Sequence, residues 1–332
     1  SRAVVSSQLA AGPEVAHLER ELSARAGHAH GVGVSSGTAA LYCALRGLGV
    51  GKGDAVVIPT YVCAALFHAV DAAGAEPVLA DVDPRTGNLR VEDVRKALRR
   101  NVKAVVVPHM FGSPAPASQI EALGVPVIED CAQCVGTTAS GRKVGSLTTV
   151  SVFSFYATKV VCAGEGGMVA TSSKRLADAV RDSIEYDNRN KLQPRFNFKL
   201  SDVHAAVARA QLRKLRTMVA RRRRIARLYR RNLTGAAGQE NLPVEEQGSR
   251  PIYFRFVVKT PGRLQAVLRR ANREGVSCAR PVYKPLHRYL GTRGFPGAEA
   301  MHASALSIPL YPDMTDAEAA RVVKVMREAL RA

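Results

Sequence analysis

The feature that most constrains the fold is an alternation of short, β-branched apolar runs with segments of helical pattern. The runs that we expect to form strands are 56–58, 77–80, 104–107, 125–128, 150–153 and 169–171. Helical segments near 61–73, 91–100 and 116–123 separate several of them. Strands that alternate with helices indicate a mostly parallel sheet with helices on both faces, so the chain is predicted to be an α/β protein.

The second half of the chain follows a different pattern. Residues 201–233 read as one long helix that begins at Ser201 and Asp202. After it, strand patterns are confined to 253–259 and 276–279, and helical patterns to 262–274 and 315–331. With 332 residues, the chain is long enough for two domains. We predict a large α/β domain over residues 1–220 and a small α+β domain over residues 221–332.

Composition excludes several classes of protein. No apolar run approaches the roughly 20 residues that a membrane span needs, and no secretory leader opens the chain. We therefore expect a cytoplasmic protein that does not associate with membranes. The six cysteines lie mostly in apolar surroundings and are expected to be free and buried. Cys131 and Cys134 form a CxxC pair, but no second pair completes a metal site, so no metal is predicted.

The formal net charge of +20 suggests an anionic partner. The densest basic run is Arg221–Arg224, followed by Arg227, Arg230 and Arg231. We expect the solvated face of a long helix here, with an anionic small substrate as the alternative. Nucleic acid is not predicted, because no recognised binding motif accompanies the charge.

Three groups lie where ligands bind in open parallel sheets, beyond the carboxyl ends of the strands. Asp130 follows one predicted strand, Ser154 and Lys159 follow another, and Ser36, Gly37 and Thr38 begin a helix. A carboxylate, an amine and a helix N-terminus are what pyridoxal phosphate requires. The amine binds the aldehyde covalently, the carboxylate keeps the ring nitrogen protonated, and the helix N-terminus binds the phosphate.

Each group also has a structural interpretation. Asp130 could cap the next helix, a lysine after a strand is usually a surface charge, and Ser36 to Thr38 could be only a turn and cap. The glycines at 31 and 33 suggest a dinucleotide-binding loop, but the third glycine of the pattern falls one residue late. The spacing of the groups favours the cofactor, but it does not name the reaction.

Several longer motifs resemble those of one family. They are 35–41 (SSGTAAL), 74–83 (GAEPVLADVD), 128–133 (IEDCAQ), 154–159 (SFYATK), 164–168 (GEGGM), 197–202 (NFKLSD), 285–287 (PLH) and 307–310 (SIPL). Together they resemble the DegT/StrS family of sugar aminotransferases, which has the aspartate-aminotransferase fold (fold type I). The resemblance runs from about residue 12 to residue 328 and implies a seven-stranded, mostly parallel sheet.

The resemblance implies roles for individual residues. Lys159 and Asp130 would be catalytic, Lys159 binding pyridoxal 5'-phosphate covalently and Asp130 pairing with its ring nitrogen. The remaining cofactor-binding residues would be Ser36, Gly37, Thr38, Cys63, Gln133, Ser154 and Asn197. Asn197 would reach the neighbouring site of a homodimer. Tyr186, Tyr283 and His287 are candidates for contact with substrate, although His287 could equally be a packed histidine. The family implies an amino donor, usually glutamate, and a keto sugar on a nucleotide diphosphate, or a keto cyclitol.

The chain departs from the family pattern at three places. Cys63 stands where an aromatic residue usually stacks on the cofactor ring, so Cys63 is expected against that ring or Tyr61 replaces it. Lys199 stands where the family has arginine, which loses bidentate geometry. The N-terminal segment is shorter than usual. Two other functions are disfavoured. A sugar dehydratase of the family would carry histidine in place of Lys159, and a cofactor-binding protein without catalysis would not be expected to retain Lys159, Asp130, Gln133 and Ser154 together.

Overall fold

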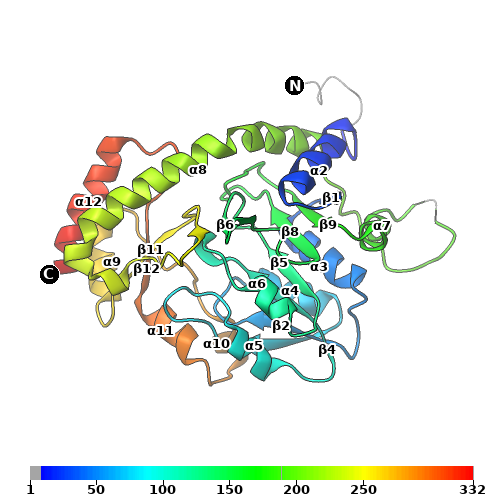
Figure 1. Cartoon of the computed structure of the whole chain (residues 1–332), viewed down its shortest axis with the longest axis horizontal. Helices are drawn as coiled ribbons and strands as arrows, with labels where there is room; N and C mark the ends of the chain where they lie inside the picture. The colour runs from blue at the N-terminus through cyan, green and yellow to red at the C-terminus, as the bar shows by residue number, and fades with distance from the viewer. Residues whose placement is uncertain (1–8, 188, 332) are drawn as a thin grey trace.

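The computed structural model of the chain describes residues 9–187 and 189–331 (Figure 1). The helices are α2 (Pro13–Arg25), α3 (Gly37–Gly47), α4 (Ala65–Ala72), α5 (Val91–Ala97), α6 (Ala117–Glu121), α7 (Lys174–Ser183), α8 (Asp202–Ala237), α9 (Leu264–Arg273), α10 (Leu286–Leu290), α11 (Pro296–Ser304) and α12 (Asp316–Arg331). Two short 3₁₀ helices are η1 (Met110–Gly112) and η2 (Gln239–Asn241). The strands are β1 (His30–Val34), β2 (Ala55–Pro59), β3 (Glu76–Ala80), β4 (Val102–Pro108), β5 (Val127–Asp130), β6 (Thr138–Ala139), β7 (Arg142–Lys143), β8 (Val150–Ser154), β9 (Gly167–Thr171), β10 (Ser249–Arg250), β11 (Phe256–Lys259) and β12 (Ala305–Ile308).

A seven-stranded sheet organises the larger part of the molecule, in the order β1-β9-β8-β5-β4-β2-β3. Strands β3, β2, β4, β5 and β8 pair in parallel, whereas β9 is antiparallel to both β8 and β1. The reversal follows from the chain, because β9 returns directly after the loop that leaves β8 and no crossover helix lies between them. The predicted α/β class and mostly parallel sheet are confirmed.

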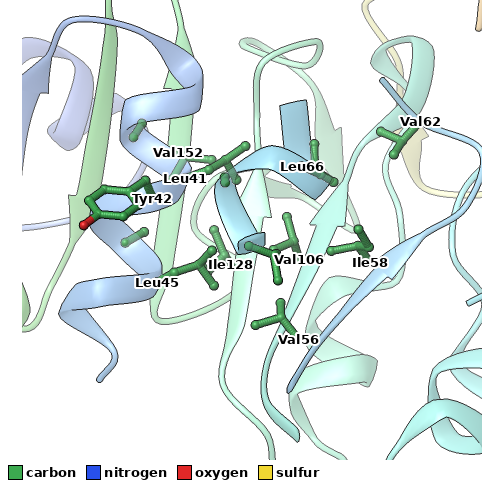
Figure 2. Packing of buried hydrophobic residues seen from close by; sticks show 14 of the residues in the cluster. Leu41, Tyr42, Leu45, Val56, Ile58, Val62, Leu66, Val106, Ile128 and Val152 are labelled. Carbon is green, nitrogen blue, oxygen red and sulfur yellow. The ribbon is translucent and has the colours of Figure 1, made fainter. Parts of the chain in front are cut away.

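Two hydrophobic clusters cover the two faces of this sheet. Side chains of a strand alternate between faces, so Val56 and Ile58 of β2 face one cluster and Val57 the other. Helices α3, α4 and α7 pack on the first face, where Figure 2 shows Leu41, Tyr42 and Leu45 of α3 beside the strand residues. Helices α2, α5, α6 and the first half of α8 cover the other. Burial on both faces explains why the strands are almost wholly apolar.

Helix α8 runs along one side of the whole molecule and is capped by Ser201, which accepts from the His204 N–H (Figure 1). Its apolar residues Leu212, Leu215 and Val219 pack in the second cluster of the sheet. Beyond Val219 they change partners, and residues from Ile225 onward join a third cluster with α9, α12, β11 and β12. This change of packing partners supports the predicted domain boundary between residues 220 and 221, which remains a proposal.

The basic run on α8 differs from its prediction. Arg222 is buried and donates to the carbonyl oxygens of Tyr253, Phe254 and Leu310, and Arg223 donates to those of Pro251 and Arg250. The run is therefore not a solvated face throughout. Arg222 and Arg223 hold the segment before β11 against α8. No local sequence pattern predicts this contact.

Several elements were missed or misplaced. The expected strand at 276–279 is reduced to a single bridge between Ala279 and Ser307, whereas the strand that pairs with β11 is β12. Strand β1 was also missed, since its two glycines weaken the β pattern, as were helices α7, α10 and α11. Within the described residues, no helix is long and apolar enough to cross a membrane.

Candidate active site

A cavity of about 210 Å³ opens where the carboxyl ends of β5 and β8 meet the N-terminus of α3. Seven of the predicted cofactor residues line it: Ser36, Gly37, Thr38, Cys63, Asp130, Ser154 and Lys159. They come from four separate stretches of the chain. The parallel strands and the first turn of α3 therefore bring the predicted lysine, carboxylate and helix start to one place.

The N-terminus of α3 forms one wall of the cavity. Ser36 caps the helix by accepting from the Ala39 N–H at 3.0 Å. The other N–H groups of the first turn have no partner within the helix, because no helical turn precedes them. Gly37 packs directly against Ser154, because a Cβ at position 37 would lie 2.7 Å from the Ser154 Cβ. The N–H groups of the first turn of α3 can bind an anion, so a phosphate fits this wall of the cavity.

Asp130 ends β5 and is buried with one carboxylate oxygen accepting from the Ala132 N–H at 3.0 Å. Burial raises the pKa of this carboxyl group, while the Ala132 N–H and the charge of Lys159 oppose the rise. A buried carboxylate that faces a cavity is stabilised by a cationic partner. A protonated ring nitrogen is such a partner, so the donor set fits pyridoxal phosphate.

Lys159 lies in the loop between β8 and β9. The loop is held closed by hydrogen bonds from Phe155 N to Gly166 O and from Ala163 N to Phe155 O, each 2.8 Å long. Its amine Nζ lies 5.4 Å from the centroid of the Phe254 ring and pairs with no carboxylate among the described residues. An unpaired amine at the wall of a cavity is available for covalent chemistry.

Phe254 was missed by the sequence analysis. It lies 95 positions after Lys159 and two residues before the start of β11, and it packs with the sheet residues of the second cluster. Its only local signal is an aromatic residue at a strand start, which predicts packing and nothing more. The contact beneath Lys159 exists only because the fold returns this segment to the sheet.

Cys63 lies on the wall of the cavity together with Lys159, as its predicted position requires. Tyr61, the alternative for stacking on the cofactor ring, is fully buried and does not line the cavity. Contact of Cys63 with the ring remains a proposal, and a thiol offers a smaller apolar surface than an aromatic ring.

Gln133 does not line the cavity itself. Its side-chain oxygen accepts from the Phe111 N–H at 2.9 Å, which leaves the amide NH₂ as its free donor. Fixed in this way, Gln133 also holds the backbone of η1 against the β5 end of the sheet. Its predicted contact with the cofactor stays a prediction.

Two predicted residues lie in the segment between α7 and α8. Asn197 is exposed and does not line the cavity, so the structure of one chain leaves its predicted reach into a neighbouring site as a proposal. Tyr186 is also exposed, and the Lys199 amine lies 4.9 Å from its ring centroid. Lys199 also pairs with Glu185 at 3.3 Å, so the lysine that replaces the family's arginine is engaged within this segment.

The other two substrate candidates lie in the segment before and within α10. Tyr283 is exposed and lies outside the cavity wall. His287 is buried, with Nδ1 2.8 Å from Thr60 Oγ1 and Nε2 2.6 Å from Glu299 Oε1. Because both ring nitrogens are engaged by protein groups, the geometry favours the packed interpretation of His287 over direct contact with substrate.

Cys131 and Cys134 lie behind the cavity, buried with His109 in a group whose ligand atoms are within 4.8 Å of one another. His109 has no free ring nitrogen, since Nδ1 accepts from the Ala115 N–H and Nε2 bonds to Glu129. A metal ion would have to displace one of these bonds, so the group serves packing.

The sheet order, the antiparallel β9 and the lysine loop between β8 and β9 define the class: a fold type I aminotransferase. The model of the DegT/DnrJ/EryC1/StrS aminotransferase family matches residues 1–327. The chain belongs to that family, as its motifs predicted.

Known proteins similar to this chain agree with the family. The UDP-N-acetyl-3-dehydro-alpha-D-glucosamine 3-aminotransferase of Acidithiobacillus ferrooxidans is 34% identical over 94% of this chain and 88% of its own length. The dTDP-3-amino-3,4,6-trideoxy-alpha-D-glucose transaminase of Streptomyces venezuelae is 33% identical over 99% of this chain and 90% of its own. The crystal structure of S. venezuelae DesV, solved with a ketimine intermediate, superposes with a TM-score of 0.94 and 32% identity, over 100% of this chain and 93% of DesV.

Proposed function

We propose that the protein transfers an amino group, supplied by glutamate, to a keto sugar carried on a nucleoside diphosphate. The observation that carries the proposal is the single cavity that joins Lys159, Asp130, Ser154 and the N-terminus of α3. The two relatives named above are transaminases of UDP- and dTDP-linked sugars, which supports this class of acceptor.

Pyridoxal phosphate fits the cavity, and when bound it supplies an aldehyde that can carry the amino group and a ring that withdraws electrons. Lys159 would hold the aldehyde, Asp130 the ring nitrogen, and Ser154 with the N–H groups of Gly37 and Thr38 the phosphate. Cys63 would lie against the ring. Each assignment follows from the position of that residue at the cavity wall.

The chain's own groups account for proton movement and for charge. Lys159 Nζ, once free, can accept and return a proton at the carbon that exchanges its amino group. Asp130 is fixed by the Ala132 N–H, so its carboxylate would be held where it can pair with the ring nitrogen of the bound cofactor. Burial of Asp130 strengthens that charge interaction, because the local dielectric is low.

We further propose a homodimer in which Asn197 of each chain reaches the phosphate site of the other. The exposure of Asn197 and its position outside the wall of its own cavity support this assignment. Sedimentation of the protein as a monomer at micromolar concentration would contradict it.

The function is tested in two steps. The protein is incubated with pyridoxal phosphate, reduced with borohydride and digested, and the modified lysine is identified by mass spectrometry; we expect Lys159, with Lys143 as an exposed control. The glutamate-treated enzyme is then offered a panel of nucleotide-linked keto sugars and one keto cyclitol. Amination of only the cyclitol would replace the proposed acceptor, and an adduct on another lysine would refute the site.

A further inference from the structure

A chain of hydrogen bonds links the surface of the molecule to the segment that carries Cys63. It reaches this segment at Thr60, which directly follows β2 and is fully buried. The Thr60 N–H donates to Ala80 O at 2.9 Å, and the Thr60 carbonyl oxygen accepts from the Leu286 N–H at 2.8 Å. The backbone of Thr60 is therefore held from two sides, by the end of β3 and by the first residue of α10.

The Thr60 side chain is bound by His287. Thr60 Oγ1 accepts from the His287 N–H at 3.0 Å and lies 2.8 Å from His287 Nδ1. At the other side of the ring, Nε2 lies 2.6 Å from Glu299 Oε1. Because a carboxylate can only accept, Nε2 carries the proton of the neutral ring, and Nδ1 then accepts from the Thr60 hydroxyl. The hydroxyl therefore has both a donor and an acceptor partner.

Glu299 forms the outer end of the chain. Arg288 Nε donates to Glu299 Oε1 at 2.8 Å, and a second guanidinium nitrogen pairs with Oε2. The hydrogen bond from Arg288 is the main cause that lowers the pKa of Glu299 to about 2, so this carboxylate is ionised. The His287 ring also stacks on Phe295, with the ring centroids 5.0 Å apart and the planes 25° apart. Both the position and the plane of the imidazole are thus fixed.

Helix α11, which carries Glu299, is anchored to the same edge of the sheet. The buried Asp81, directly after β3, accepts from the N–H groups of Gly297 and Ala298 at 2.8 Å each. A Cβ at position 297 would collide with the backbone that follows β3, so the glycine allows α11 to approach this closely. The carboxylate of Glu299 therefore holds the imidazole from a position that the end of β3 fixes.

The segment that begins at Thr60 leads into the wall of the cofactor cavity. Cys63 lines the cavity together with Lys159, as do Ala65 and Leu66 at the start of α4. Neither Thr60 nor the side chains that bind it are among the lining residues. Their influence on the cavity is therefore exerted through the backbone between Thr60 and Cys63.

We propose that His287 is a positioning residue, which through Thr60 sets where Cys63 lies on the cavity wall. The proposal rests on the proposed function, in which Cys63 lies against the cofactor ring. Buried hydrogen bonds whose members are all paired hold a segment in one arrangement. A thiol covers less of a ring face than an aromatic side chain does, so a small displacement of the segment would remove a large share of the contact.

Alkylation of Cys63 tests the position of the segment without any cofactor. The full-length protein, dialysed free of pyridoxal phosphate, is treated with iodoacetamide, and the rate at each cysteine is measured by mass spectrometry with the partly exposed Cys162 as internal standard. Thr60→Val keeps the shape of the side chain but removes the hydroxyl. We expect it to raise the Cys63 rate about fivefold, because the segment loses two hydrogen bonds, and we expect Thr60→Ser to restore the rate.

Two substitutions of His287 separate its hydrogen bond from its packing. The Asn amide oxygen in His287→Asn can take the place of Nδ1 and accept from Thr60, whereas His287→Leu has no acceptor. The Cys63 rate should therefore rise more in His287→Leu than in His287→Asn. The matched control is Thr260→Val, which removes another buried hydroxyl, one that donates to Ser304 O at 3.0 Å. It should lower the urea midpoint about as much as Thr60→Val and leave the Cys63 rate unchanged.

The bound cofactor gives the second measurement. Thr60→Val should weaken pyridoxal phosphate binding about fivefold and change the circular dichroism of its absorption band, which depends on how the ring is held. Thr260→Val should change neither. A changed Cys63 rate with unchanged dichroism would refute the contact of Cys63 with the ring and leave the positioning role standing.

The proposal is overturned if the Cys63 rate responds equally to Thr60→Val and Thr260→Val, or to neither. It is also overturned if His287→Leu and His287→Asn give the same rate, and this pair decides the question if Thr60→Val does not fold. If the unchanged protein binds no pyridoxal phosphate, the proposed function fails, while the Cys63 rates still show whether His287 positions the segment.

Discussion

Two neighbouring carboxylates of β5 lie in contrasting regions. Glu129 points away from the cavity and is saturated: it accepts from Gly145 N, Leu147 N and Thr148 N and bonds to His109 Nε2 at 3.1 Å. Asp130 faces the cavity and, within residues 9–187 and 189–331, accepts one hydrogen bond, from the Ala132 N–H. Both are buried, so burial does not distinguish them. The unused hydrogen-bonding capacity of Asp130 marks the side chain that is kept for a ligand.

The same contrast holds between the buried Arg222 and the half-buried Arg255. Arg222 donates to three backbone carbonyl oxygens in the region where α8 meets the segment before β11. Among the described residues, the Arg255 guanidinium makes one long hydrogen bond, 3.4 Å to Ser307 Oγ, and lines a small cavity of about 40 Å³. A saturated buried charge holds elements together, whereas an unsaturated one is ready to bind.

The strongest test of the contrast is Asp130→Asn. Turnover should fall by roughly a hundredfold or more, because the neutral amide no longer stabilises a protonated ring nitrogen. The urea midpoint should stay the same or rise, since a buried charge is removed. Both effects are checked by measuring kcat and urea unfolding of the same variant. A large loss of stability would mean that Asp130, like Glu129, has a structural role.

Glu129→Gln should show the opposite pattern. The amide NH₂ would oppose backbone N–H donors and leave His109 without its anion, so we expect a loss of about 3 kcal/mol in the free energy of unfolding. The kcat of the folded fraction should stay within a few-fold of the original. Chemical denaturation followed by circular dichroism measures the first effect, and an unchanged midpoint would break the comparison.

Arg222→Met should cost about 2 kcal/mol of unfolding free energy. The methionine keeps part of the packing, while three carbonyl oxygens lose their donors. The exposed Arg227→Met on the same helix is the matched control and should be close to neutral. If both substitutions lowered the free energy of unfolding equally, the three hydrogen bonds of Arg222 would contribute nothing to stability.

Gly37→Ala should weaken cofactor affinity about tenfold with little change in fold stability. The new methyl group would lie 2.7 Å from the Ser154 Cβ, so Ser154 and the first turn of α3, which are proposed to bind the phosphate, would have to move apart. Fluorescence titration with pyridoxal phosphate measures the effect. Gly235→Ala, at an open position on α8, is the control.

The smallest effect concerns His302, whose buried Nδ1 has no hydrogen-bond partner among the described residues and which lies outside the cavity of Lys159. Burial, followed by the charges of Arg280 and Arg288, lowers the pKa of His302 to about 4. The unfolded chain therefore binds this proton from its ordinary value of 6.5 downward and the folded chain does not, so stability declines as pH falls from 6.5 to 4. Urea unfolding of His302→Gln between these pH values should show a smaller decline in the free energy of unfolding. An identical decline would mean that His302 does not cause the pH dependence.

The sequence was sufficient to predict seven of the residues that line the cavity at the ends of β5 and β8. Asp130, Ser154, Lys159 and the Ser36–Thr38 turn each follow or begin a regular element, and parallel strands bring such ends to one edge of the sheet. The sequence also determined the family, because its motifs lie within single loops and strand ends. Motifs of this kind can be recognised from the sequence alone, because all their residues lie in one short segment.

Only the tertiary structure decided which polar groups are satisfied. Arg222 and Arg255 both stand in apolar or basic stretches, yet one meets three carbonyl oxygens and the other an open space. The packed state of His287 depends on Thr60, which is 227 positions away. Phe254 lies beneath Lys159 because a later segment folds back on the sheet. Hydrogen bonds between distant segments are set by how the elements pack, and no local spacing in the chain encodes them.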